Sequence, residues 1–148
     1  MTELRDRVDG IVHEPTQVHG GGVDLTLADV ALVVEPGRLD FGGGEFEPAA
    51  FDPVKPTLRD PDDDYGWYDL NGSAYRVAFN ESLTGDTPVR LRPREDLLAC
   101  GATVPTRRTT ALDPVPMTVV ARAGDPVSDD SATIRLKENA RIARIEPI

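Results

Sequence analysis

The sequence predicts an all-β fold, a sandwich or jelly roll with one short helix. Apolar and β-branched runs recur about every 8–12 residues, the strand spacing typical of sandwiches and barrels. The turns between the runs are rich in Gly, Pro and Asp, and amphipathic helical periodicity is almost absent. Because the chain has 148 residues and no internal repeat, we expect residues 1–148 to form a single domain.

The first half of the chain predicts strands separated by long loops. Residues 3–10 are expected to form a short helix or a frayed end, with Gly10 as its stop. Residues 23–34 are rich in β-branched side chains and predict one or two strands, broken near Asp29. Residues 45–66 combine prolines and acids with spaced apolar side chains, which predicts a long surface excursion laid over the sheet.

The second half begins with a predicted hairpin. Residues 67–70 and 74–79 read as strands, and Asn71-Gly72 between them is a strong turn signal. Residues 97–100 form a helical turn that Gly101 ends, because glycine can adopt the positive φ that stops a helix. Further strands are expected over residues 116–121, residues 133–136 and the C-terminal stretch.

The composition is strongly acidic. Asp and Glu number 26 against 16 Lys and Arg, for a net charge of −10, and the only lysines are Lys55 and Lys137. Such a surface is typical of halophilic proteins, because a Debye length of about 3 Å at 1 M salt makes self-repulsion tolerable. An ordinary acidic domain is the alternative. In either case the negative charge argues against nucleic acid as a partner.

Several other classes of protein are excluded by what the sequence lacks. No stretch approaches about 18 consecutive apolar residues, so we expect no membrane partner. The single cysteine, Cys100, excludes an intramolecular disulfide framework, and no Cys/His cluster has zinc spacing. The charged N-terminus has no apolar signal core, which predicts a cytoplasmic protein. His13 and His19 are expected to be polar loop residues.

Most of the side chains suited to chemistry lie between residues 91 and 114. Arg94, Glu95 and Asp96 form a polar turn before the predicted helical turn, and Asp113 lies in a second turn further on. Polar groups on turns between apolar strands are how a β-scaffold usually builds a site. We therefore expect the functional site to include this segment.

This segment resembles the centre of the dUTPase and dCTP deaminase superfamily. There, an Arg-Ser-Ser-Leu turn and a short helix lead to a Gly and then to a hairpin bearing Ile-Asp. The matching residues here are Arg94-Glu95-Asp96-Leu97, Gly101 and Leu112-Asp113. Two more stretches are similar to family motifs: Gly21-Gly22-Val23-Asp24-Leu25 to Gly-x-Asp-Leu, and Asn139-Ala140-Arg141-Ile142-Ala143-Arg144-Ile145 to Gly-x-Arg-Ile-Ala-Gln-Leu.

The resemblance implies a distorted jelly roll, the dUTPase-like β-clip, assembled as a homotrimer with sites between subunits. It implies a deoxynucleoside triphosphate as substrate and Mg²⁺ as cofactor. Asp24 would lie near the triphosphate and help to hold the water shell of Mg²⁺, for which carboxylate oxygens are suited. Asp113 would orient and deprotonate the water that attacks the α-phosphorus. The residues on the implied substrate-binding motifs are Arg94, Glu95, Asp96, Gly101 and Arg141.

The chain departs from the family pattern at the substrate-binding turn. Glu95 and Asp96 replace two serine hydroxyls, and carboxylates repel a triphosphate unless a metal or arginines intervene. The deaminase branch has an arginine where Ala99 stands and a glutamate on the following strand, where residues 117–121 carry no acid. The general acid/base that deamination requires is therefore missing. The zinc deaminase signature is also absent.

Three hypotheses follow from these observations. The first is a dUTP diphosphatase, which converts dUTP and water to dUMP and diphosphate. The second is a dCTP deaminase, alone or combined with dUTP hydrolysis. The third is a non-catalytic member that binds a nucleotide or has a structural role, in which Asp113 is a plain turn acid and Asp24 a solvated or paired one. Convergence of Asp24, Arg94 and Asp113 on one cleft would favour the hydrolase.

Overall fold

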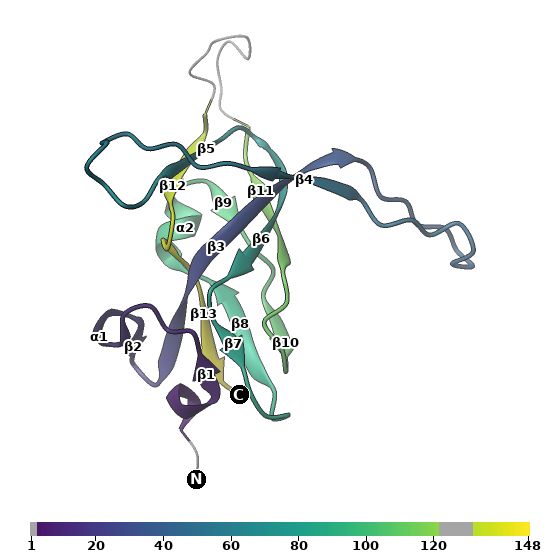
Figure 1. Cartoon of the computed structure of the whole chain (residues 1–148). Coiled ribbons are helices and arrows are strands. Elements are labelled where there is room, and N and C mark those ends of the chain that lie inside the picture. Colours follow the sequence, from purple (N-terminus) through teal and green to yellow (C-terminus); the bar gives the residue numbers. More distant parts are fainter. Residues whose placement is uncertain (1–2, 122–131) are drawn as a thin grey trace.

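The computed structural model describes residues 3–121 and 132–148, which form a curled antiparallel sheet around one long strand, β3 (Figure 1). The helical elements are η1 (Leu4–Arg7), α1 (Glu14–Gln17) and α2 (Glu95–Ala99). The strands are β1 (Val8–Asp9), β2 (Val18–His19), β3 (Gly22–Glu35), β4 (Ala50–Val54), β5 (Trp67–Leu70), β6 (Ser73–Phe79), β7 (Ser82–Leu83), β8 (Val89–Pro93), β9 (Ala102–Thr103), β10 (Arg107–Thr109), β11 (Val115–Val119), β12 (Ile134–Lys137) and β13 (Arg141–Pro147). Within the described ranges no helix is long and apolar enough to cross a membrane.

Strand β3 divides its length between two sets of partners. Its first half pairs with β13, which pairs in turn with β8, and its second half pairs with β6. The main sheet runs β10-β8-β13-β3-β6-β11-β9, with β2 and β4 added along β3. Two smaller sheets join β1 to β7 and β12 to β5. The predicted all-β fold of the distorted jelly-roll type is confirmed.

The break predicted near Asp29 is a β-bulge in a continuous strand. The register between β3 and β6 shifts between Leu27 and Asp29, and β3 continues for 14 residues in all. A bulge bends a strand and increases its twist without ending its pairing. This bend lets one strand take part in both halves of the curled sheet.

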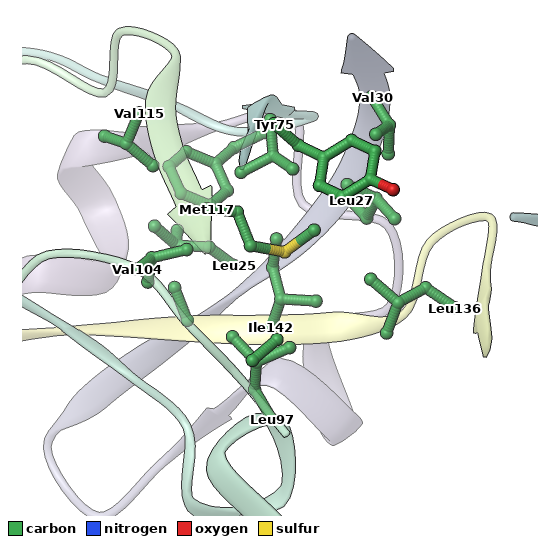
Figure 2. Close-up of a cluster of buried hydrophobic side chains, with 14 of the residues drawn as sticks. Leu25, Leu27, Val30, Tyr75, Leu97, Val104, Val115, Met117, Leu136 and Ile142 are labelled. Atoms are coloured by element: carbon green, nitrogen blue, oxygen red, sulfur yellow. The ribbon is translucent and has the colours of Figure 1, made fainter. Parts of the chain in front are cut away.

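The core lies inside this curl and anchors the short helix α2. Figure 2 shows Leu97 of α2 pointing toward Ile142 of β13, within the cluster of buried apolar side chains that also holds Leu25 and Met117. Leu97 is the one buried residue of α2. The helix ends as predicted, because Gly101 adopts a φ of +94°. Packing of Leu97 therefore fixes the turn that begins at Arg94 against β13.

The predicted surface excursion is partly a strand. Strand β4 pairs with the second half of β3, so residues 50–54 extend the sheet. Between β3 and β4 the chain runs out from the sheet as an arm, visible at the side of Figure 1 and closed by a bridge between Arg38 and Glu47. Loop residues 55–66 return toward β5 through a bridge between Thr57 and Trp67.

The hairpin predicted at Asn71-Gly72 is wrong. The flanking strands β5 and β6 do not pair with each other, because β5 pairs with β12 while β6 pairs with β3 and β11. Asn71-Gly72 instead carries the chain from the small sheet to the main one. A Cβ on Gly72 would lie 2.3 Å from the Cα of Ala121, so the glycine is needed for close approach of two backbones.

This close approach predicts a stability cost for a single methyl group. We expect Gly72→Ala to lower the free energy of unfolding by about 1–3 kcal/mol, because backbone atoms must move apart. Gly44→Ala is the matched control, since an added Cβ there meets nothing within 4 Å. Urea unfolding at constant salt measures both variants. Equal midpoints for the two alanine variants would contradict the steric account.

Candidate functional site

A fully buried carboxylate, Asp24 on β3, is the centre of the candidate site. The exposed fraction of Asp24 is 0%. Its Oδ1 atom accepts a hydrogen bond from Arg144 Nη1 at 3.1 Å. Its Oδ2 atom lies 2.8 Å from His19 Nε2, 3.0 Å from Arg141 Nη1 and 3.4 Å from Arg94 Nε. Both carboxylate oxygens are therefore engaged by cationic or imidazole groups.

The sheet register brings these side chains together. Arg144 on β13 lies directly opposite Asp24 on β3, and Arg92 on β8 lies directly opposite Arg144. Residues that face each other across neighbouring strands point to the same side of the sheet. The three strands thus build a row of charge, Arg92, Arg144 and Asp24, on one face. Arg94 and Arg141 join it from the end of β8 and the start of β13.

The glycines before Asp24 leave room for the arginine. A Cβ on Gly22 would lie 2.7 Å from Nη2 of Arg144, so the guanidinium passes over the bare backbone of β3. The same Nη2 donates a hydrogen bond to the carbonyl oxygen of His19. The same Cβ would also lie 2.7 Å from the carbonyl oxygen of Ile145, so glycine at position 22 leaves room both for this guanidinium and for the backbone of β13.

Electrostatics hold Asp24 in its ionised form. Burial is the largest single influence and disfavours the charge. Hydrogen bonds from His19 and Arg144, together with the charge of Arg94, outweigh burial and keep the pKa of Asp24 below its usual value. Removing one partner of such a buried pair leaves the remaining charges uncompensated. Asp24 is thus a structural necessity for the arginines around it.

A second buried carboxylate, Glu81, fixes the backbone next to Asp24. Glu81 is 2% exposed and accepts hydrogen bonds from the N–H of Thr26 at 2.7 Å and from Gln17 Nε2 at 3.0 Å. The Gln17 Nε2 atom also donates to the carbonyl oxygen of Asp24 at 2.9 Å. This network joins α1 and the connection between β6 and β7 to β3, and it holds the strand on which Asp24 lies.

A cleft of about 300 Å³ opens beside Asp24. The residues that line it are His19, Asp24, Arg92, Arg94, Glu95, Arg144 and Glu146. At its mouth the Glu146 carboxylate lies between two guanidinium groups, 2.6 Å from Arg92 Nε and 3.5 Å from Arg144 Nε. Three guanidinium groups around one small opening are suited to bind an anion such as a phosphate.

Most of the residues predicted to bind substrate gather at this cleft. Arg94 and Glu95 line it, and Arg141 reaches Asp24 from its edge. Asp96 is exposed and lies 3.4 Å from Arg94 Nη1, which partly offsets its charge. Gly101 ends α2 against Val120 and does not line the cleft.

Asp113 lies elsewhere in the single chain. Its side chain is exposed and borders a separate hollow of about 20 Å³ that Leu91 also lines. Leu91 and Arg92 are neighbours on β8 and point to opposite faces of the strand. The predicted convergence of Asp24, Arg94 and Asp113 on one cleft is therefore not found within one copy of the chain. Only Asp24 and Arg94 converge.

Four cleft residues were not predicted as site residues: His19, Arg92, Arg144 and Glu146. Arg144 lies inside a recognised motif, at the place of the family's Gln, and this substitution was an available signal. His19 was expected to be a loop residue, yet its imidazole ring is hydrogen-bonded to the carboxylate of Asp24. His13 fits the loop prediction, since its Nδ1 bonds Thr16 on the exposed surface. Arg92 and Glu146 owe their positions to register, which local sequence does not reveal.

The cleft of one chain does not fit a directly bound Mg²⁺ ion. A hard cation needs free carboxylate oxygens, and both oxygens of Asp24 already contact arginine or histidine nitrogens. Within residues 3–121 and 132–148, no group of three or more His, Cys, Asp or Glu side chains is placed to share a metal ion. The role of Asp24 in the water shell of Mg²⁺ stays a prediction.

Comparisons with known proteins agree with the fold and the motifs. No protein-family model matches the chain. It is 32% identical over 143 residues to "Probable deoxyuridine 5'-triphosphate nucleotidohydrolase" of Methanosarcina acetivorans, a match covering 93% of this chain and 75% of that protein. It is 30% identical over 101 residues to the protein of the same name from Methanococcoides burtonii, covering 67% of this chain and 56% of that one. The chain thus spans little more than half of the second relative.

A solved structure shares the fold. The 2'-deoxycytidine 5'-triphosphate deaminase from Agrobacterium tumefaciens superposes with a TM-score of 0.51 over 95% of this chain and 43% of that chain, at 13% identity. Fold and cleft define an all-β protein with an arginine-lined cleft. The relatives identify the family. The chain belongs to the dUTPase family, within the dUTPase and dCTP deaminase superfamily.

The buried ion cluster around Asp24 predicts that a conservative substitution of this residue strongly lowers the stability of the fold. Asp24→Asn keeps the shape but removes the charge, so we expect the free energy of unfolding to fall by about 3–5 kcal/mol. Asp69→Asn is the control, because Asp69 is 45% exposed and pairs with Arg59 at the surface. For Asp69→Asn we expect the free energy of unfolding to fall by about 0–1 kcal/mol. Denaturant unfolding at neutral pH measures both variants.

The same cluster predicts how the Asp24→Asn effect depends on pH. The stabilisation by Asp24 is fully present above the carboxyl's unfolded pKa of about 4 and is lost as the pH falls through the lower pKa of the folded state. The stability difference between the wild type and Asp24→Asn should therefore shrink in acid. A difference that stays constant down to strongly acidic pH would contradict an ionised Asp24.

Proposed function

We propose that the protein hydrolyses dUTP to dUMP and diphosphate. The observation that carries this proposal is the gathering of Arg94, Arg141 and Arg144 around Asp24, which unites three separate sequence motifs of the family. Guanidinium groups bind phosphate oxygens through paired, charge-assisted hydrogen bonds. In this proposal the polyphosphate occupies the cleft, and the arginines neutralise the charge that develops on the leaving diphosphate.

The catalytic carboxylate in this proposal is Asp113 of a second copy of the chain. Within one copy Asp113 lies away from the cleft, so the site is incomplete unless a neighbouring copy supplies the base. A homotrimer with sites between subunits would do this, and closed symmetry is the usual outcome for such interfaces. Asp113 would then accept the proton of the water that attacks the α-phosphorus. Mg²⁺ enters this proposal only as an ion carried by the polyphosphate.

The test is a substrate panel. The full chain is incubated in molar salt with Mg²⁺ and each of dUTP, dCTP, dTTP and dATP, and the products are separated chromatographically. We expect dUMP and diphosphate from dUTP. Release of dUTP from dCTP would replace the hydrolase with a deaminase. Absence of products from every nucleotide would leave the non-catalytic hypothesis.

The proposed role of Asp113 as the general base predicts that its substitution lowers turnover without preventing nucleotide binding. Asp113→Asn keeps the shape of the side chain and removes the proton acceptor, so turnover of dUTP should fall by roughly 10²–10⁴-fold while nucleotide binding survives. Asp86→Asn, another exposed turn acid, is the matched control and should keep its turnover. Hydrolysis by Asp113→Asn at the wild-type rate would end the assignment of Asp113.

The shared site also predicts the oligomeric state. Static light scattering in molar salt should return three times the mass of the chain. A monomer mass under conditions where dUTP is hydrolysed would show that one copy is sufficient. Asp113 of a neighbouring copy would then have no role.

A second candidate is a nucleotide-binding member without catalysis. The observation in its favour is that Glu95 and Asp96 occupy the turn next to Arg94, where the family has phosphate-binding hydroxyls. Deamination of dCTP has less support, because Ala99 lacks the arginine function and β11 carries no acid. Binding of dUTP without turnover would establish this second candidate.

A further inference from the structure

We propose that Arg92 and Arg144 form a seat for one phosphate group, and that Glu146 fills this seat as an internal, displaceable anion. The proposal deepens the function proposed above, because it rests on a polyphosphate as the ligand of the cleft. It assigns Glu146 as a competitor of the ligand and Arg92 as a phosphate-binding residue, positions outside the three sequence motifs.

The contacts of Glu146 are those expected of a bound anion. Oε1 accepts a hydrogen bond from Arg92 Nε at 2.6 Å, and Oε2 lies 3.5 Å from Arg144 Nε. Each carboxylate oxygen of Glu146 therefore contacts a different guanidinium group. A phosphate bridging two arginines uses two of its oxygens in the same way. Glu146 lies two residues beyond Arg144 on β13, so both side chains emerge on the face that carries the cleft.

The two arginines are held differently. Arg144 has a side-chain exposure of 7% and is fixed by Asp24 Oδ1 and the carbonyl oxygen of His19. Arg92 and Glu146 lie at the mouth with side-chain exposures of 33% and 31%. Water screens an ion pair at such a position, so the pair is weak. Glu146 can thus swing out to solvent while Arg144 stays in place.

Glu146 carries the charge that a competitor needs. The hydrogen bond from Arg92 is the main cause that keeps the pKa of Glu146 below its usual value, and Arg144 adds to it. A phosphate group that carries more negative charge than a carboxylate is attracted more strongly to the guanidinium groups at the same distance. The seat also compensates for Glu95 and Asp96, which replace two phosphate-binding hydroxyls of the family. The guanidinium groups of Arg92 and Arg144 supply hydrogen-bond donors in place of those hydroxyls.

The test measures the affinity of the full chain for inorganic tripolyphosphate by titration calorimetry at fixed salt. Glu146→Gln removes the competing charge and should tighten binding by about tenfold, the effect expected if Glu146 occupies the seat nine-tenths of the time. Arg92→Gln should weaken binding. Thermal melts verify that both variants are folded, and either variant alone tests the seat.

Two control variants separate the seat from general electrostatics. Glu95→Gln removes the same charge from the same cleft without touching the pair of guanidinium groups, and its gain should be smaller than that of Glu146→Gln. Glu47→Gln removes a charge from the exposed arm, where Glu47 pairs with Arg38, and should leave the affinity unchanged. Equal gains from Glu95→Gln and Glu146→Gln would overturn the seat and leave only a charge effect.

The remaining outcomes separate this inference from the proposed function. If the wild type hydrolyses dUTP but Glu146→Gln binds tripolyphosphate no more tightly, the seat is refuted and the hydrolase stands. If no nucleotide is hydrolysed but Glu146→Gln tightens and Arg92→Gln weakens binding, the seat stands and the hydrolase is refuted. Absence of tripolyphosphate binding to the wild type and to Glu146→Gln would overturn the seat.

Discussion

The structure depends on one buried negative charge, that of Asp24. A carboxylate without exposure is strongly unfavourable unless cations compensate it, and three arginines do so here. Those arginines come from the end of β8 and from β13, so the charge ties the first half of β3 to two distant parts of the chain. The same ion pair is one reason for glycine at position 22, where a side chain would meet both the guanidinium of Arg144 and the carbonyl oxygen of Ile145.

This arrangement makes stability and binding interdependent. Two of the arginines that stabilise Asp24, Arg94 and Arg144, also line the cleft, so Asp24 pre-orients groups that would meet a phosphate. Pre-oriented donors bind and stabilise charge better than donors that must first be ordered. The network of Gln17, Thr26 and Glu81 extends this rigidity to the backbone of β3. Arg92 and Glu146, more exposed, are the part of the cleft that can rearrange.

Family membership and the geometry of the single chain raise the question of assembly. The cleft and Asp113 lie on different sides of β8, so hydrolysis by the proposed route requires more than one copy. The replacement of two hydroxyls by Glu95 and Asp96 changes the local charge where a triphosphate would bind. The arginines of β8 and β13 are the compensation that the fold provides.

The sequence by itself determined the all-β class and the helix stop at Gly101, and its motifs singled out Asp24, Arg94 and Arg141 as separate candidate residues. These features depend on local patterns: turn residues, strand periodicity and short signatures. Only the tertiary structure decided that Asn71-Gly72 joins two sheets, that His19, Arg92, Arg144 and Glu146 belong to the cleft, and that Asp113 does not meet Asp24 in one copy. The physical reason is that strand partners and register are set by contacts between residues far apart in the chain. Alternation along a strand fixes which side chains share a face, but not which other strands lie beside them.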